Sequence, residues 1–467
     1  MARCVLSLLM VDTLNPALSA RDRGPIPAQP QMPPPPQRMS AAQIRSGTPA
    51  MLRTGVVIAL SLLIFFPRFQ LNVGPYIANV GLIGQFLIIG ILLAKNSLRV
   101  DPVRGALYAV GIAIMFIAWV WSPSTSSYLS AMLVGASYLA FIFVARLPDG
   151  NEALQRFIMV AFCNLMLIAA AAGILQFFMQ FVYKPGWLFD FTGYIPELIR
   201  GGGNYNTVIS AGGFLKSNGF FFREPSTCSQ YLALALICEI AMWRRKLRKI
   251  SLIRMATLGF CLLLTYSGTG LVTLFVGLMF PLGLKTALRM GALALGAAVI
   301  FFVLGSALNL GFTANRVSEF SSPGTSAYAR YVAPFVFIQN QMDSYSITFL
   351  IGHGPGSVTR NALHRSMYEN ADPTWAKLLF EYGVIGFVTF VSLVFYSTFR
   401  SRAPAELIAA FCFGWFILWG GVFLAPEMTA LIFILSAVAS AGVSSNNRQR
   451  SRVVVDVGQL SMPSQRR

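Results

Sequence analysis

The chain has little charge. Only 11% of its 467 residues are Asp, Glu, Lys or Arg, whereas soluble globular domains carry about 25%. Hydrophobic residues make up 55% of the sequence, and its mean hydropathy is +0.64. This composition excludes a set of soluble cytosolic domains and predicts an all-α, polytopic membrane protein.

Acidic residues are especially scarce. There are 17 Asp and Glu against 36 Lys and Arg, which gives a formal net charge of +19. In a soluble protein this excess would suggest a nucleic-acid partner, but in a membrane protein basic residues collect in cytoplasmic loops. We therefore expect membrane lipid, and no nucleic acid, among the partners.

The sequence also lacks the patterns of a disulfide framework or a structural zinc site. It has six cysteines and two histidines, with no CxxC motif and no Cys/His cluster. We expect the cysteines to act as small hydrophobes in helix packing, and we predict neither a metal nor a cofactor.

The two ends differ from the middle of the chain. Residues 1–50 contain the proline-rich stretch 25–37, which favours extended chain over a packed core. We expect a disordered cytoplasmic tail there, or else a true start at Met39 or Met51. Residues 51–442 form the predicted transmembrane catalytic domain, and 443–467 a basic cytoplasmic tail.

Windows of about 20 mainly apolar residues predict membrane spans. Twelve such spans are expected, at 52–69, 76–94, 105–121, 127–145, 157–182, 226–243, 255–268, 270–284, 290–312, 378–398, 404–421 and 425–442. The seventh and eighth are short, and we expect two half-length helices that meet in a tight turn at 267–269.

The distribution of Lys and Arg orients these spans. With the amino terminus in the cytoplasm, each short cytoplasmic connection contains basic residues, whereas the outer connections 122–126 and 421–424 contain none. The outer connection 70–75 follows a single basic residue, Arg68. Both termini are therefore predicted to be cytoplasmic.

Two outer connections are long, at about 183–225 and 313–377. Long loops are exempt from the charge bias, so their basic residues need another explanation. These loops also hold both histidines, and connections of this length are usually functional. We therefore expect the chemistry on the extracytoplasmic side.

The first long loop ends in Arg223, Glu224 and Pro225, where a helix is expected to begin. A guanidinium beside the free amides of a first helical turn suits a phosphate group. Two alternatives are equally compatible with this sequence: an ion pair between Arg223 and Glu224, or contact with lipid headgroups.

The second long loop combines arginines with candidate bases. This composition is expected where an anionic leaving group is held and a hydroxyl is activated, although ordinary loop polarity would also account for the histidines. The arginines are Arg330, Arg360 and Arg365, and the candidate bases are His353, His364, Glu369 and Asp372.

Glu239 and Glu427 are the notable carboxylates inside predicted spans. Such residues are costly and usually functional. Glu239 lies near the cytoplasmic end of its span, and we expect it to pair with Arg244 or Arg245. Glu427 lies near the outer end of the last span, where it could face the site.

Four short motifs, in order, resemble the bacterial O-antigen polymerase and O-antigen ligase superfamily of Wzy-like and WaaL-like glycosyltransferases. They are GFFFREPSTCSQYLALAL, LLLTYSGTGLVTL, the YARY tetrapeptide around Arg330, and IGHGPGS followed by LLFEYGVIGF. Together they cover about residues 210–390. Each motif is short and degenerate, and the ordered set is moderately specific.

The resemblance implies a metal-independent, GT-C-like enzyme of the bacterial inner membrane with a periplasmic site. Its substrate would be an oligosaccharide on undecaprenyl diphosphate, and a chain-length regulator protein is an implied partner. Arg223 and Arg330 match positions expected to grip the diphosphate, and Glu381 matches the glutamate that opens the following helix. Ligase-like members usually have His-Asn where this sequence has Asp372 and Pro373.

The resulting prediction is a polymerase of lipid-linked repeat units in exopolysaccharide or O-antigen synthesis. Arg330 is the predicted catalytic arginine, and Asp372 or His364 the predicted base. The diphosphate ligands are expected among Arg223, Arg330, Arg360, Arg365 and His353, with Glu224 and Glu381 nearby. The alternatives are an O-antigen ligase acting on lipid A-core and, as a non-enzyme, a lipid-linked sugar flippase or transporter.

Overall fold

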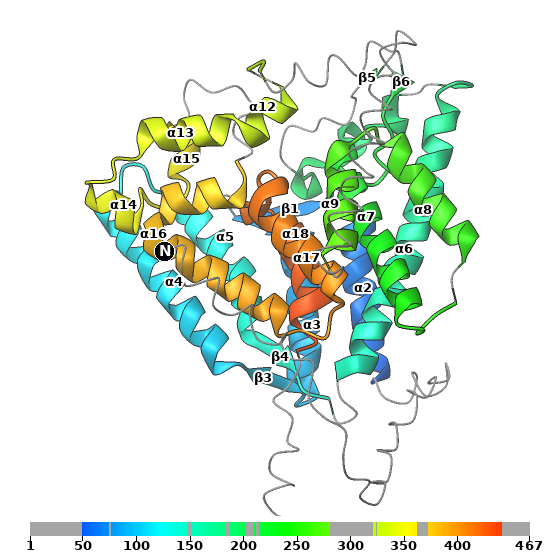
Figure 1. Cartoon of the computed structure of the whole chain (residues 1–467), viewed down its shortest axis with the longest axis horizontal. Coiled ribbons are helices and arrows are strands. Elements are labelled where there is room, and N and C mark those ends of the chain that lie inside the picture. Colours follow the sequence, from blue (N-terminus) through cyan, green and yellow to red (C-terminus); the bar gives the residue numbers. More distant parts are fainter. Residues whose placement is uncertain are drawn as a thin grey trace, which may run out of the picture. The chain divides into compact units, whose positions relative to one another are not determined.

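The structure is a computed structural model, and it describes residues 49–73, 76–147, 151–183, 186–201, 210–211, 214–249, 251–280, 321–323, 325–361 and 372–440. The all-α prediction is confirmed at the level of fold class, with fifteen α-helices in these ranges (Figure 1). They are α2 (Ala50–Phe65), α3 (Val80–Ala94), α4 (Pro102–Trp121), α5 (Tyr128–Leu139), α6 (Asn151–Met179), α7 (Pro225–Arg244), α8 (Leu252–Leu264), α9 (Gly268–Met279), α12 (Ser326–Tyr331), α13 (Ala333–Gln341), α14 (Ile347–Ile351), α15 (Ser357–Asn361), α16 (Thr374–Phe399), α17 (Ala405–Phe413) and α18 (Pro426–Ile432).

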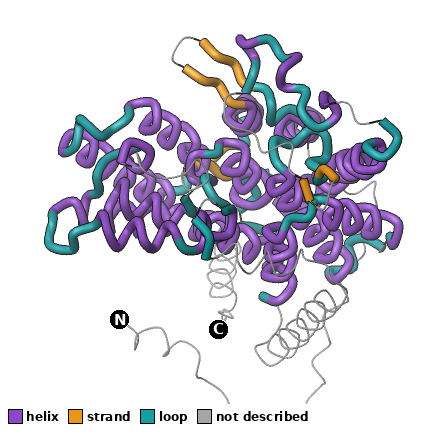
Figure 2. Tube along the Cα trace, turned by 90° about the horizontal axis from the view of Figure 1, so that it is seen from above, coloured by secondary structure: helices purple, strands orange, loops and turns teal. Residues whose placement is uncertain are grey.

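Three antiparallel strand pairs accompany the helices (Figure 2). Hydropathy windows did not predict them, because two- to four-residue strands leave no periodic signal at that length. They are β1 (Gln70–Val73) with β2 (Tyr76–Asn79), β3 (Leu98–Val100) with β4 (Phe143–Ala145), and β5 (Ser210–Ala211) with β6 (Phe214–Leu215).

Eleven of the twelve predicted spans coincide with helices, and the span expected at 290–312 lies outside the described residues. Three helices, α4, α6 and α16, are long and apolar enough to cross a membrane, and seven shorter helical segments are also apolar. The chain is thus a membrane protein with several apolar candidate spans.

Several predicted span boundaries were wrong. The first helix ends at Phe65 instead of residue 69, because Pro67 cannot continue it. The second begins at Val80 instead of residue 76, since β2 occupies the four residues before it. The fourth stops at Leu139, where a 3₁₀ turn leads into β4.

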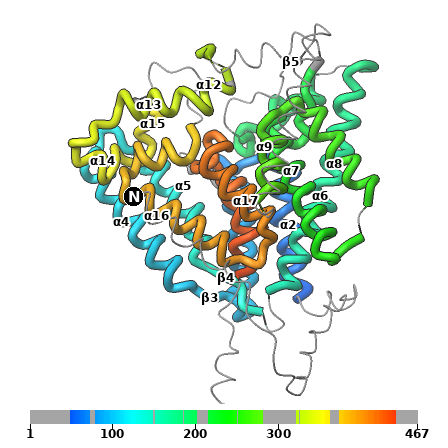
Figure 3. Tube along the Cα trace, viewed as in Figure 1, coloured from blue at the N-terminus to red at the C-terminus, as the bar shows by residue number. Residues whose placement is uncertain are grey.

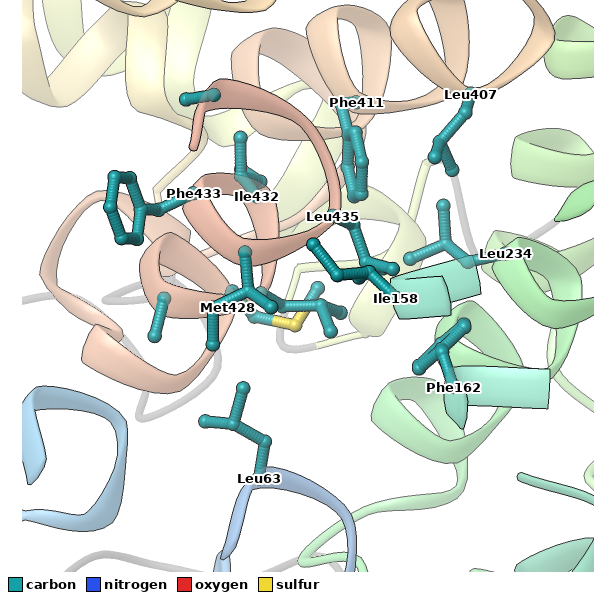
Figure 4. Packing of buried hydrophobic residues seen from close by; sticks show 14 of the residues in the cluster. Leu63, Ile158, Phe162, Leu234, Leu407, Phe411, Met428, Ile432, Phe433 and Leu435 are labelled. Atoms are coloured by element: carbon teal, nitrogen blue, oxygen red, sulfur yellow. The ribbon is translucent and has the colours of Figure 1, made fainter. Parts of the chain in front are cut away.

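The expected tight turn between two half-length helices is confirmed. Helix α8 ends at Leu264 and α9 begins at Gly268, and Tyr266 between them has a positive φ of 47°. Both helices pack against α7 instead of against each other. Part of the buried core, where apolar side chains of α2, α6, α7, α17 and α18 pack, is seen in Figure 4.

The predicted cytoplasmic connections lie together. Strand β3 follows the second predicted span and pairs with β4, which precedes the next predicted cytoplasmic connection. Arg104 is buried and donates to the carbonyls of Ser397 and Ala437, both at 3.1 Å, so it joins the ends of three chain segments. The sequence had suggested only an orienting charge there.

Glu239 forms the expected structural ion pair, but the predicted partners were wrong. Its Oε1 lies 2.6 Å from Arg254 and 3.3 Å from Arg248. Arg244 pairs with Glu406 instead, at 3.4 Å. Helix α7 ends in this region, and the chain turns back so that the next helix brings Arg254 to the carboxylate.

Candidate functional site

Arg223 stands immediately before α7, which begins at Pro225 as expected. Its Nε donates to the carbonyl of Pro67 at 2.6 Å, and its Nη2 lies 3.4 Å from Oε1 of Glu427. The guanidinium is therefore oriented by the end of α2 and by α18. Among the described residues, Arg223 forms an ion pair with Glu427 and not with the adjacent Glu224.

Glu427 lies in the first turn of α18 and is held from a second side. Asn79 donates from Nδ2 to its Oε1 at 2.8 Å, while the Asn79 Oδ1 accepts from the amide of Gly81 and so caps α3. A side chain at Gly81 would overlap the backbone of Pro426. The close approach of α3 and α18 thus places Asn79, Glu427 and Arg223 in one cluster.

Arg330 belongs to the short helix α12 and is half-buried. Burial lowers the pKa of its guanidinium, and the carboxylate of Glu224 partly offsets this by favouring the charged form. Glu224 precedes α7 and also accepts from the hydroxyl of Ser226 at 2.7 Å. Of the two arginines expected to bind the diphosphate, Arg330 is therefore influenced by the residue that directly follows the other, Arg223.

Arg68 is a structural partner of this cluster that sequence reasoning missed. It is 1% exposed, pairs with Asp190 at 3.1 Å, and donates to the carbonyl of Phe222 at 2.8 Å. Arg223 in turn donates to the carbonyl of Pro67, which precedes Arg68. Each of the two arginines thus binds the backbone next to the other one. The signal in the sequence that could have identified Arg68 is its position as the single basic residue beside the predicted outer connection 70–75.

A second group of charged residues lies at the start of α16. Asp372 is buried, and its carbonyl accepts from the amide of Gly421 at 2.9 Å. Lys377 and Glu381 form a buried ion pair with an Nζ–Oε1 distance of 3.0 Å. Glu381 does not open the helix as predicted, because α16 starts seven residues earlier, at Thr374.

The GHGPGS turn packs against a break in α16. The helix is interrupted at Gly383, which has φ 63° and ψ −171°. The carbonyls of Phe380 and Glu381 accept from the amides of His353 and Gly354, at 3.0 and 2.9 Å. The turn thereby satisfies the carbonyls that end the first part of α16.

His353 is held tightly in this turn. Its ring stacks on Phe380 with centroids 4.3 Å apart, and Nδ1 lies 3.3 Å from the Phe380 carbonyl, to which it donates. Burial lowers the pKa of the imidazole, and the bond to Phe380 opposes this shift. Near neutral pH His353 is therefore an uncharged ring that positions the turn.

The remaining predicted residues divide into two groups. Arg360, at the end of α15, donates from Nη1 to the carbonyls of Ser124 and Ser126, at 3.0 and 2.7 Å. It thus fastens the second outer loop to the connection between α4 and α5. Three predicted residues lie outside the described ranges: His364, Arg365 and Glu369.

The geometry separates two clusters. In the part of the chain that the structure describes, Arg223 pairs with Glu427 at the starts of α7 and α18, and the adjacent Glu224 acts electrostatically on Arg330. Asp372 contacts the connection before α18, close in sequence to Glu427. Helices α12 to α15 and α16 can be located in Figure 3.

Comparison with known protein families identifies the family of this chain. Residues 55–441 match the family model described as WcaD colanic acid polymerase. The chain belongs to this family. Searches of curated proteins and of solved structures found no match.

The colanic acid polymerase family is a family of Wzy-like polysaccharide polymerases, so the expected superfamily is confirmed. The protein is a membrane glycosyltransferase that polymerises lipid-linked repeat units in exopolysaccharide synthesis. Among the alternatives that the sequence left open, this favours the polymerase over the ligase and the flippase.

Proposed function

We propose that the polymerase transfers a glycan from undecaprenyl diphosphate to a sugar hydroxyl of a second lipid-linked repeat, and that Arg223 and Arg330 bind the donor diphosphate. The observation that supports this best is their convergence. They come from two predicted outer loops more than 100 residues apart, yet the carboxylate of Glu224, next to Arg223, is near enough to Arg330 to favour its charged form.

The charges of this cluster suit an exchangeable anion. Arg223 pairs with Glu427, and the carboxylate of Glu224 favours the charged form of Arg330, so each guanidinium has a carboxylate that offsets its charge. A diphosphate offers more acceptor oxygens than a carboxylate and matches guanidinium groups bidentately. It therefore replaces one or both carboxylates when the lipid-linked donor enters.

The transfer needs a base and a stabilised leaving group. The acceptor hydroxyl gives its proton to Asp372 or His364 and attacks the anomeric carbon, while the bond between that carbon and the diphosphate oxygen breaks. Undecaprenyl diphosphate departs with the bonding electrons, and the two arginines stabilise its added charge. Fixed positive charge thus performs the task that a metal ion performs elsewhere, and no metal or cofactor is part of the proposal.

We place this reaction at the periplasmic face of the bacterial inner membrane. The proposed topology has twelve spans in a GT-C-like arrangement, with both termini in the cytoplasm. Contacts between the outer connections support it, because Arg223 reaches Pro67 and Arg360 reaches Ser124. A chain-length regulator protein and membrane lipid are the further proposed partners.

The test compares three arginine variants expressed in a strain that lacks the native gene. We expect Arg223→Ala and Arg330→Ala to abolish polymer and to accumulate single repeats on the lipid carrier at the outer face. Arg200→Ala is the matched control, because Arg200 lies in the first outer loop and its guanidinium contacts only the nearby carbonyl of Ile195 among the contacts described.

Extraction and mass analysis of the lipid-linked glycans, alongside membrane immunoblots, distinguish the outcomes. Normal polymer length and yield in Arg330→Ala, at equal protein level, would contradict the assignment. Accumulation of complete chains on the carrier would indicate a ligase instead.

A further inference from the structure

An apolar pocket of about 230 Å³ lies at the outer ends of α2 and α3. Its walls come from residues 62–83 and from one residue that is distant in sequence, Ile199. Leu62 belongs to α2 and Phe66 directly follows it, Leu71 belongs to β1 and Ile83 to α3, while Ile199 lies in the predicted first outer loop. Phe66, Leu71 and Ile83 are each more than 40% exposed, so the pocket is open on one side.

The walls of this pocket also hold the arginine cluster. Pro67 directly follows Phe66 in the wall and accepts the hydrogen bond from Arg223. Asn79 directly precedes the pocket-lining start of α3 and binds Glu427. The Arg223–Glu427 pair is therefore connected to both sides of the pocket through one residue each.

The pocket lies beside the carboxyl end of α2. Leu62 lies four residues before Phe66, and at 1.5 Å per residue the pocket extends about 6 Å along α2. Arg223 donates to the carbonyl of Pro67, which lies two residues after the end of α2. Positive charge at the surface above an apolar pocket fits an amphiphile with an anionic head and a hydrocarbon tail.

We propose that this pocket binds the first isoprene units of the substrate's polyprenyl tail while Arg223 holds its diphosphate. The inference rests on the proposed function, because it assumes that the diphosphate lies at Arg223. It assigns a tail-binding subsite to the outer ends of α2 and α3. The tail continues from the open side of the pocket into the bilayer.

The test measures binding to the full-length protein in phosphatidylcholine nanodiscs. The two probes are radiolabelled undecaprenyl diphosphate and inorganic pyrophosphate, which has no tail. Ile83→Trp fills the pocket with a larger ring system. The control is Ile58→Trp, because Ile58 lies on α2, is 46% exposed and does not line the pocket.

We expect Ile83→Trp to weaken binding of undecaprenyl diphosphate at least about tenfold, because the tail loses its apolar contacts. Its pyrophosphate affinity stays at the wild-type value, and Ile58→Trp changes neither. Arg223→Ala weakens both probes.

Each other outcome is decisive. Unchanged undecaprenyl diphosphate binding in Ile83→Trp, with a loss in Arg223→Ala, overturns the tail subsite and leaves the proposed function intact. Equal losses of both probes in Ile83→Trp also overturn it, because the pocket would then act only through the arginine cluster. Unchanged binding in Arg223→Ala rejects the proposed function itself. Displacement of the probe by phosphatidylglycerol at equal concentration means that the pocket takes bulk lipid, and it overturns the subsite.

Discussion

The break in α16 at Gly383 gives the sharpest stability prediction. With φ 63° and ψ −171°, this residue occupies a backbone region that is essentially restricted to glycine, and another residue there costs about 1–3 kcal/mol. An added Cβ would also overlap the backbone of Leu350 in α14. Gly383→Ala therefore forces α14 and the following turn away from α16.

The consequences can be worked out from the contacts that this movement breaks. The amides of His353 and Gly354 lose their bonds to the carbonyls of Phe380 and Glu381. Each such bond contributes about 1 kcal/mol. Together with the backbone strain, we expect Gly383→Ala to lower the free energy of unfolding by about 3–5 kcal/mol.

Equilibrium unfolding in mixed micelles with an increasing fraction of SDS, followed by tryptophan fluorescence, measures this difference. Gly90→Ala is the control, because Gly90 lies inside α3 and its added Cβ would meet no atom within 4 Å. That variant is expected to gain about 0.5–1 kcal/mol, since alanine favours the helix. A free energy of unfolding in Gly383→Ala equal to that of the wild type would refute the reasoning.

Two further predictions concern the same region. Lys377→Met or Glu381→Gln alone should lower the free energy of unfolding by about 3–5 kcal/mol, because each leaves a buried charge or dipole without its partner. In the same unfolding assay the double variant should lose much less than the sum of the two single losses, and additive losses would contradict a coupled pair. His353 has a folded-state pKa below its ordinary 6.5, so its contribution to stability is complete above pH 6.5 and is lost as the pH falls through the folded value. The difference in unfolding free energy between wild type and His353→Gln should shrink from pH 7.5 to pH 5, and a difference independent of pH would exclude this effect.

The sequence was sufficient for features that depend on neighbouring residues. Apolar runs located the helices, and the order of Arg223 and Pro225 located the start of α7, because proline favours the first helical turn. The tight turn before α9 followed from small and polar residues between two apolar runs. The GHGPGS sequence was recognised as a turn for the same reason.

Features that depend on distant partners were not predictable in the same way. Glu427 lies about 200 residues from Arg223, and no local pattern joins them. Glu381 does not open a helix because α16 already begins at Thr374, and the break at Gly383, which packs against Leu350, has no signal in the residues around it. Span boundaries at β2 and β4 failed because strand pairing, which is set by tertiary structure, overrode hydropathy.

Arg68 shows how an exception to the charge rule can be informative. Arg68 lies at the predicted outer end of the first span, where a basic residue opposes the orientation bias, so we expect other interactions to compensate for it. In the structure that compensation is the ion pair with Asp190 and the bond to Phe222, next to Arg223. The charge bias therefore does more than orient the chain. Where a short loop violates it, the violating residue marks a place at which the fold needs a buried cation, and here that place adjoins the proposed diphosphate site.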